Sequence, residues 1–368
     1  MIMSGYTLRK EKPFSHVYLT GLVRDSQGRK MSKQLGNSPD AIKLMETYGA
    51  DGVRVGLLLS AAAGNDLLFD ENLCQQGKNF ANKIWNAFRL VQSWNVDENL
   101  PPCETAALGL EWYTAKFQQT LAVIDDHFSK YRISDALMAT YKLIWDDFCS
   151  WLLEIVKPAY GAGIDAKTYK KVCALFEDNL RLLHPFMPFL SEELWHALKV
   201  RTEDEALIVS DWPAQLTVNS DILSRFDHTA ELIAQLRTLR KNQNLSFKEP
   251  IAIVEVKNDA ISLRPIVTKL ANVGSWKQEE CSPEQALSFR VNAHEYFVPV
   301  AASNLEEERQ KMEEELAYQE GFLKAVEKKL SNERFVSNAP QQVVAIERKK
   351  ANDALEKIEA LKARLAAF

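Results

Sequence analysis

The middle of the chain carries apolar residues at the spacing of one face of an α-helix. From about residue 76 to 215 they recur at intervals of three and four, as Phe80, Ile84 and Val91 do in the first stretch. Further stretches with this period follow the break at Pro101-Pro102. Successive amphipathic helices joined by short links are typical of an antiparallel bundle. We therefore expect a mainly α-helical protein built around a helix bundle.

The tryptophans of this region are expected in its core. Trp85, Trp145, Trp151 and Trp195 each lie within an apolar period, which favours packing over base stacking.

The first 75 residues show a different pattern, in which strand-like and helix-like stretches alternate as in a remnant of an α/β domain. The apolar run Val17-Tyr18-Leu19 predicts a buried strand. A turn and a basic tetrapeptide, residues 30–33, come next. Ser38 and Asp51 are the predicted N-caps of the helices that follow.

The basic tetrapeptide Lys30-Met31-Ser32-Lys33 has the chemistry of a loop that binds ATP phosphates. When a carboxylate attacks the innermost phosphate, negative charge builds on the departing pyrophosphate. The ammonium groups of Lys30 and Lys33 could stabilise that charge in the transition state. Gly28 and Gly36 on either side would let the backbone open and close. Judged by the tetrapeptide alone, a basic surface turn is a commoner interpretation than a phosphate-binding loop.

The last part of the chain predicts a small subdomain and then a helical hairpin. A helix from Phe226 to Arg240 precedes strand-like segments at 251–256 and 297–300, which together indicate a small α/β appendage. From residue 303, two runs of apolar residues at coiled-coil spacing are joined by a short link at 331–339, and two such seams favour an antiparallel hairpin.

Bulk composition limits the class of protein. With 368 residues, 46% of them hydrophobic and 26% charged, the chain has room for two or three globular domains. No apolar run approaches the roughly 20 residues of a membrane span. The five cysteines form no Cys-x-x-Cys pair, so we expect no metal site and a cytoplasmic location. The net charge of −5 means that any RNA contact must use local basic patches.

Several segments together carry a resemblance to a known family. They are residues 13–25 with the tetrapeptide, the run Tyr48 to Arg54, Gly64-Asn65-Asp66, residues 79–86, residues 183–195 and the last 65 or so residues. In these segments the chain resembles the class I aminoacyl-tRNA synthetases, and within them the valyl-tRNA synthetase family. The resemblance implies ATP with Mg²⁺, valine and tRNA(Val) as ligands of the parent enzyme, and a monomer that binds no membrane.

The resemblance implies four domains. They are the C-terminal part of a catalytic α/β domain (1–75), an anticodon-binding helix bundle (76–220), a small α/β subdomain (221–302) and a coiled-coil tRNA-binding arm (303–368). The family's pentapeptide ends in serine, where this chain has Gln34. The family's upstream His-x-Gly-His signature does not occur. We therefore expect a C-terminal fragment that cannot catalyse ATP and pyrophosphate exchange alone.

The site residues follow from the same resemblance. Lys30 and Lys33 would be catalytic, and residues 30–33 would bind ATP. Twelve basic residues are candidates for RNA contact: Lys78, Lys83, Arg89, Arg237, Arg240, Lys241, Lys328, Lys329, Arg334, Arg348, Lys349 and Lys350. For Lys78, Lys83 and Arg89, solvated surface is an equally good interpretation, and the cluster at 237–241 could instead complement the helix dipole.

Three alternatives stay open at this point. The chain could be a non-catalytic RNA-binding or scaffold protein built from such modules. It could belong to an isoleucyl or leucyl relative, although those lack an arm of this kind. It could also be a coiled-coil protein that recruits a protein partner.

Overall fold

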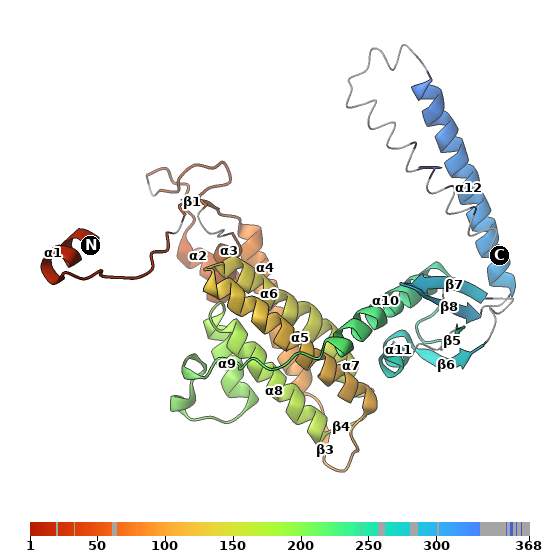
Figure 1. The fold of residues 1–368 in the computed structure, drawn as a ribbon, viewed down its shortest axis with the longest axis horizontal. Helices are drawn as coiled ribbons and strands as arrows, with labels where there is room; N and C mark the ends of the chain where they lie inside the picture. Colours follow the sequence, from red (N-terminus) through yellow and green to blue (C-terminus); the bar gives the residue numbers. More distant parts are fainter. Residues whose placement is uncertain are drawn as a thin grey trace. The chain divides into compact units, whose positions relative to one another are not determined.

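The computed structural model describes residues 1–19, 21–32, 34–60, 65–243, 245–256, 262–279, 286–299 and 302–331, together with residues 351, 354, 355, 358 and 362. The chain divides into two compact units (Figure 1). The first comprises Met1–Thr229 and Ser262–Leu270, and the second comprises Ala230–Ile261 and Ala271–Phe368. The four segments expected from the sequence stay a prediction.

The N-terminal part of the first unit holds a small parallel sheet and three helices. These are α1 (Ile2–Arg9), β1 (Val23–Arg24), α2 (Ala41–Tyr48), α3 (Ala50–Ser60) and β2 (Leu67–Leu68). Strand β1 pairs with β2 in parallel, with Val23 opposite Leu67. The prediction of a buried strand at residues 17–19 is wrong, because these residues are exposed and lie outside any strand. The pairing instead forms at residues 23 and 24, where β2 supplies hydrogen-bond partners.

Both expected N-caps are also corrected. Helix α2 is capped by Asp40, whose Oδ1 accepts a hydrogen bond from the backbone N of Ile42 at 2.9 Å. Ser38 lies outside the helix. Asp51 falls within the first turn of α3, and its carboxylate caps a different helix, as described below.

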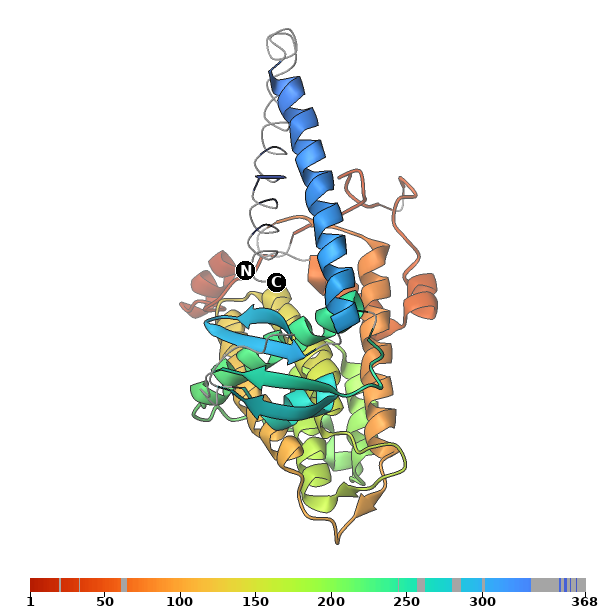
Figure 2. The same cartoon turned by 90° about the vertical axis from the view of Figure 1, so that its right-hand side faces the viewer.

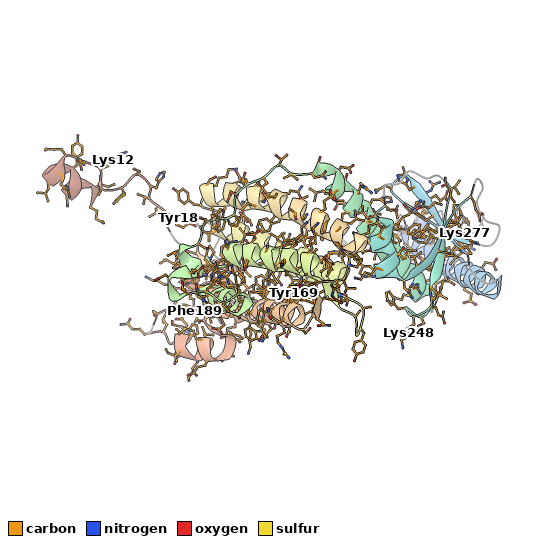
Figure 3. The ribbon with its side chains drawn as sticks, turned by 90° about the horizontal axis from the view of Figure 1, so that it is seen from below. Lys12, Tyr18, Tyr169, Phe189, Lys248 and Lys277 are labelled. Atoms are coloured by element: carbon orange, nitrogen blue, oxygen red, sulfur yellow. The ribbon has the colours of Figure 1, made fainter. Side chains whose placement is uncertain are left out.

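The rest of the first unit is a helix bundle, which confirms the mainly α-helical class. Its elements are α4 (Glu71–Gln92), β3 (Val96–Asp97), α5 (Glu104–Ser129), α6 (Ile133–Lys142), the π-helix η1 (Leu143–Leu152), α7 (Leu153–Val156), β4 (Ile164–Asp165), α8 (Ala166–Leu183) and α9 (Pro188–Leu198). Side chains from these helices fill the space between them (Figure 3). The largest fully buried ones include Trp112, Tyr113 and Phe80.

Three further helical elements follow α9: the 3-10 turns η2 (Glu203–Glu205) and η3 (Leu207–Val209), and then α10 (Ser220–Asn242). Helix α10 contains the helix expected from Phe226 to Arg240. Its Phe226 ring stacks on Trp112 with centroids 3.6 Å apart, which anchors the start of α10 in the bundle core.

The second unit contains a four-stranded sheet and a long helix (Figure 2). The sheet order is β6-β5-β8-β7, formed by β5 (Ile251–Glu255), β6 (Val273–Gln278), β7 (Ala286–Val291) and β8 (His294–Pro299). Helix α11 (Arg264–Ala271) joins β5 and β6 in sequence, and these two strands run parallel, while β8 is antiparallel to β5 and β7. The expected strands at 251–256 and 297–300 overlap β5 and β8.

Helix α12 (Ala302–Leu330) forms the first limb of the expected hairpin. The described residues of the last segment lie against it: Lys362 Nζ is 2.8 Å from Glu320 Oε1. Val326 on α12 and Ala351, Ala354 and Ile358 after it are all buried, at the spacing of one helical face. The two segments therefore lie side by side. The expected link at 331–339 falls mostly outside the described residues.

Candidate functional site

Residues 30–32 of the basic tetrapeptide form the return limb of a tight turn after β1. Gly28 N donates to Asp25 O and Asp25 N donates to Arg29 O, both at 2.9 Å, and Met31 N donates back to Val23 O at 3.2 Å. Gly28 has φ +76°, a conformation that favours glycine. The turn therefore brings Lys30 back alongside Arg24, with which it forms an antiparallel bridge.

Asp25 is the buried centre of this turn, with a side chain that is 8% exposed. Its carboxylate accepts hydrogen bonds from Arg29 N and Arg29 Nε, both at 2.8 Å, and from Gln27 N at 3.0 Å. Asn37 Nδ2 donates to it at 3.0 Å. The hydrogen bond from Asn37, together with those from Arg29 and Gln27, holds the pKa of Asp25 far below its usual range despite burial. The turn is thus organised around a permanent negative charge.

Asn37 closes the loop from its far end. Besides the bond to Asp25, its Nδ2 donates to Lys30 O at 3.2 Å, and its Oδ1 accepts from Ser32 N at 2.9 Å. Sequence reasoning missed this residue. The available signal was an asparagine directly after Gly36, since asparagine side chains often hydrogen-bond nearby backbone in turns.

The four predicted ATP-binding residues are compared by their exposure to solvent. Lys30 is exposed, and Met31 and Ser32 are half-buried. Lys33 lies outside the described residues. Lys30 therefore presents an accessible amine on a backbone that Asn37 anchors. The ATP role of these residues stays a prediction.

Asp66 ties β2 to the strand before the loop. Its Oδ1 accepts from Leu22 N at 2.9 Å, and its Oδ2 pairs with Arg24 Nε. Arg24 Nη1 also donates to Gly28 O at 3.1 Å. A Cβ atom on Gly21 would lie 1.8 Å from Asn65 O, so only glycine fits there. Two of the family-like segments thus support the turn that carries Lys30.

A second junction links α3 to the turn between α8 and α9. The Asp51 carboxylate accepts from Phe189 N at 3.3 Å and from Leu190 N at 2.7 Å, and so caps the N-terminus of α9 (Phe189 is labelled in Figure 3). One turn along α3, Arg54 donates to Phe186 O at 3.3 Å and to Pro185 O at 3.2 Å. Charges of opposite sign on α3 therefore satisfy backbone groups at the start of α9 and in the turn that precedes it.

Burial raises the pKa of Asp51, because desolvation outweighs the hydrogen bonds from α9 and the nearby Arg54. His184 lies in the same junction, where its Nδ1 is 2.8 Å from Ser191 Oγ. Ser191 is fully buried, and its hydroxyl donates to Met187 O at 2.7 Å. Serine, histidine and aspartate thus have a structural role here, since no substrate can reach the hydroxyl.

The three basic residues of α4 have different environments. Lys78 Nζ donates to Thr47 O at 2.7 Å, which places it at the end of α2. Lys83 Nζ lies 5.5 Å from the centre of the Trp145 ring. Arg89 is exposed in the last turn of α4. Eleven residues separate Lys78 from Arg89, about 16 Å along a helix, so the three do not form one compact patch.

The prediction that Trp85 lies in the core of the bundle is wrong, because this residue is 40% exposed. It lies one turn before Arg89 on α4, with its ring centre 5.8 Å from that of Phe88. Residues four apart share a helical face, so an aromatic surface and a cation occur together there. Trp195 is buried as expected, and Trp145 and Trp151 are half-buried.

Arg240 was wrongly predicted as an RNA contact. Its side chain is 3% exposed, and the guanidinium donates to four backbone carbonyls at 2.8–3.0 Å: those of Ser246, Glu249, Ala271 and Asn272. It holds the ends of three segments of the second unit together.

The other RNA-contact candidates stay predictions. Arg237 and Lys241 are exposed on α10, as are Lys328 and Lys329 in the last turn of α12. Arg334, Arg348, Lys349 and Lys350 lie outside the described residues.

The described part of the chain offers neither a membrane-spanning helix nor a cluster of metal-ligating side chains. No helix there is long and apolar enough to cross a membrane. No group of three or more histidine, cysteine, aspartate or glutamate side chains there could hold a metal ion.

Three protein-family models match the chain. Residues 1–70 match "tRNA synthetases class I (I, L, M and V)", residues 111–256 match "Anticodon-binding domain of tRNA ligase", and residues 304–368 match "Valyl tRNA synthetase tRNA binding arm". A solved structure, the ternary complex of Agrobacterium radiobacter K84 agnB2 LeuRS-tRNA-LeuAMS, has a TM-score of 0.44 and 22% identity, covering 60% of this chain and 26% of that one. That likeness supports no argument about residues.

Curated relatives match along almost the whole chain. The "Valine--tRNA ligase" of Christiangramia forsetii is 57% identical, over 99% of this chain and 42% of the relative. That of Porphyromonas gingivalis is 50% identical over 98% of this chain and 41% of the relative. That of Geobacillus kaustophilus is 36% identical over 100% and 43%. The chain therefore belongs to the valine–tRNA ligase family of class I synthetases and corresponds to the C-terminal portion of its relatives, with an anticodon-binding domain and a tRNA-binding arm.

Proposed function

We propose that this chain is the tRNA-binding portion of an enzyme that joins valine to tRNA(Val) with ATP. The observation that carries the proposal is the arm at residues 304–368, which matches a model specific to valyl-tRNA synthetases and follows an anticodon-binding domain in the same chain. The chain spans about 42% of the length of such relatives, so the activity belongs to a longer protein.

Two surfaces are proposed to bind the tRNA. The first is the exposed face of α4, where Trp85 offers a ring for base stacking and Arg89 a cation for phosphate. The second is the arm, with Lys328 and Lys329 on α12 and the predicted cluster Arg348, Lys349 and Lys350. Because the net charge of the chain is −5, these local cations must supply the attraction to phosphates.

The loop after β1 is proposed to bind the phosphates of ATP. The accessible amine of Lys30 and the anchored backbone behind it suit a mobile polyanion, and Lys33 would add a second ammonium group. ATP brings three linked phosphates that carry the charge these amines neutralise. In the parent enzyme, Mg²⁺ is proposed to accompany the nucleotide.

The chain by itself is proposed to bind tRNA without activating valine. Purified chain should bind tRNA(Val) more tightly than a tRNA of another specificity, with an affinity that falls as salt rises. It should show no valine-dependent exchange between ATP and pyrophosphate. Equal affinity for any RNA would refute the tRNA assignment, and measurable exchange would refute the inactivity of the chain alone.

A full-length valine–tRNA ligase that carries this chain at the matching positions, called here the full-length ligase, is the control. If that protein catalyses valine-dependent exchange between ATP and pyrophosphate and the chain alone does not, the alternative of a non-catalytic scaffold protein is also excluded.

A further inference from the structure

The geometry points to Asn37 as a positioning residue that fixes the loop backbone so that Lys30 meets the phosphates of ATP. This inference rests on the proposed ATP role of the loop. It adds a residue to which neither the family models nor the names of the relatives assign a role.

The Asn37 side chain uses both of its polar atoms across the two limbs of the loop. Its Nδ2 donates to Asp25 Oδ2 at 3.0 Å on one limb and to Lys30 O at 3.2 Å on the other. Its Oδ1 accepts from Ser32 N at 2.9 Å. A single amide therefore fixes the backbone on both sides of Met31.

This part of the loop is sparsely packed. Gly28 and Gly36 have positive φ angles, and a Cβ atom added to either would meet no atom within 4 Å. Lys30, Gln34 and Leu35 are exposed. Met31 N donates to Val23 O and Leu35 N donates to Ser32 Oγ, both at 3.2 Å, and the Asn37 bonds to Lys30 O and Ser32 N complete this small set of restraints on the loop backbone.

The hydrogen-bond partners of the side chain at position 37 require both a donor and an acceptor, as an amide provides. Asp25 is a buried carboxylate that already accepts three bonds from Gln27 and Arg29, so its partner at position 37 must donate. Ser32 N needs an acceptor from the same side chain. Asparagine meets both needs, whereas aspartate would satisfy Ser32 and place a second negative charge against Asp25.

The expected consequence is an effect on the rate of adenylate formation. The Lys30 amine should interact with ATP most strongly in the transition state, when negative charge develops on the departing pyrophosphate. A loosely held loop backbone should therefore lower kcat and leave the KM for valine unchanged. A purely structural role in folding would instead change the yield or the stability of the protein at constant kcat per folded molecule.

The test uses four variants: Asn37→Ala, Asn37→Asp, Asp25→Asn, and the exchange variant Asn37→Asp with Asp25→Asn. In the exchange variant an amide at position 25 donates to the carboxylate at position 37, which still accepts from Ser32 N. The same amide nitrogen replaces the oxygen that accepts from Arg29 Nε, and Asp25→Asn by itself measures that loss. Ser38→Ala is the matched control, because Ser38 is exposed beside Asn37 and caps no helix.

Two readouts are compared. Hydrogen exchange of the peptide spanning residues 26–37 is measured on the chain itself. Valine-dependent ATP and pyrophosphate exchange is measured on the full-length ligase.

Asn37→Ala should speed exchange of the Ser32 amide about tenfold and lower kcat about tenfold, the effect of losing one to two net hydrogen bonds. Asn37→Asp should be worse than Asn37→Ala. In a double-mutant cycle with both single variants, the exchange variant should show a favourable coupling of about tenfold between positions 25 and 37 in both readouts.

The inference is overturned if Asn37→Ala leaves either the hydrogen exchange of this peptide or kcat at the wild-type value, or if the double-mutant cycle shows no coupling between positions 25 and 37. If the unaltered full-length ligase lacks valine-dependent exchange, the proposed function fails instead. Hydrogen exchange then decides by itself whether Asn37 holds the loop.

Discussion

Replacement of Arg240 should destabilise the second unit without removing a contact to RNA. The guanidinium is almost fully buried and donates to four carbonyls, two in the segment between α10 and β5 and two at the end of α11. Burial lowers the pKa of Arg240, but an arginine stays charged in proteins, so the four carbonyls satisfy a permanent charge.

The magnitude can be worked from these bonds. Each hydrogen bond to a charged group contributes about 1.5–3 kcal/mol, which gives a gross loss of roughly 6–12 kcal/mol for four. Part of this is offset, because the exposed carbonyls regain water and the cost of burying the guanidinium, several kcal/mol, disappears. We expect Arg240→Ala to lower the free energy of unfolding by about 3–5 kcal/mol, a large share of the stability of a domain.

The assay is urea unfolding of the whole chain, followed by hydrogen exchange in peptides from β5 and β6 so that the second unit is observed by itself. Arg240→Lys should lose more than half of the same amount, since a lysine ammonium cannot span four carbonyls with a planar fork. Lys241→Ala is the control, because Lys241 lies on the same helix with an exposed side chain.

The salt dependence of tRNA binding decides between the two roles of Arg240. A structural arginine leaves the slope of log affinity against log salt unchanged in molecules that remain folded. A phosphate contact would reduce that slope by about one. Unchanged stability together with a reduced slope would refute the structural account.

Four further predictions follow from the structure and the sequence. Burial raises the pKa of Asp147 on η1 from 3.8 to about 6, so the folded protein keeps a proton that the unfolded chain releases between those values, and stability falls as pH rises through that window. Asp147→Asn should flatten this dependence in thermal unfolding and add up to about 3 kcal/mol at neutral pH; an unchanged pH profile would contradict this. Gly21→Ala should disrupt the pairing of β1 with β2, since its Cβ would meet Asn65 O at 1.8 Å, and faster hydrogen exchange at residues 22–24 would report it; native exchange rates would exclude the clash. In the full-length ligase, Lys33→Ala should slow adenylate formation about 10²-fold with little change in tRNA affinity, and an unchanged rate removes Lys33 from the mechanism. Replacing Arg348, Lys349 and Lys350 together with alanine should weaken tRNA binding and flatten its salt dependence, and a constant slope would assign them to solvated surface.

Local periodicity was enough to predict much of the fold. The intervals of three and four in residues 76–215 predicted the bundle helices, because an apolar stripe on a helix must be buried against another element. The strand-like segments near 251 and 297 overlap β5 and β8 for a similar reason, since alternation marks a sheet with one buried face. The basic tetrapeptide predicted a phosphate-binding loop or a surface turn, and the apolar seams predicted a helical hairpin. The resemblance to the class I synthetases then supplied the family, which these patterns alone left open.

Side-chain partners far apart in the sequence were beyond this reasoning. Asp51 caps α9, which begins more than a hundred residues later, so a local rule assigned it to its own helix. Trp85 lies in an apolar period and is nevertheless 40% exposed, which the period by itself could not predict.

The sequence determined which segments form helices and strands and which chemistry they carry, because these depend on residues within one or two turns of each other. Tertiary structure alone decided that Arg240 serves the fold, that Asp51 and Arg54 join α3 to the bundle, and that Asn37 holds the loop of Lys30. Each of these roles depends on which polar groups meet at hydrogen-bond distance, and that follows from how the chain packs in three dimensions.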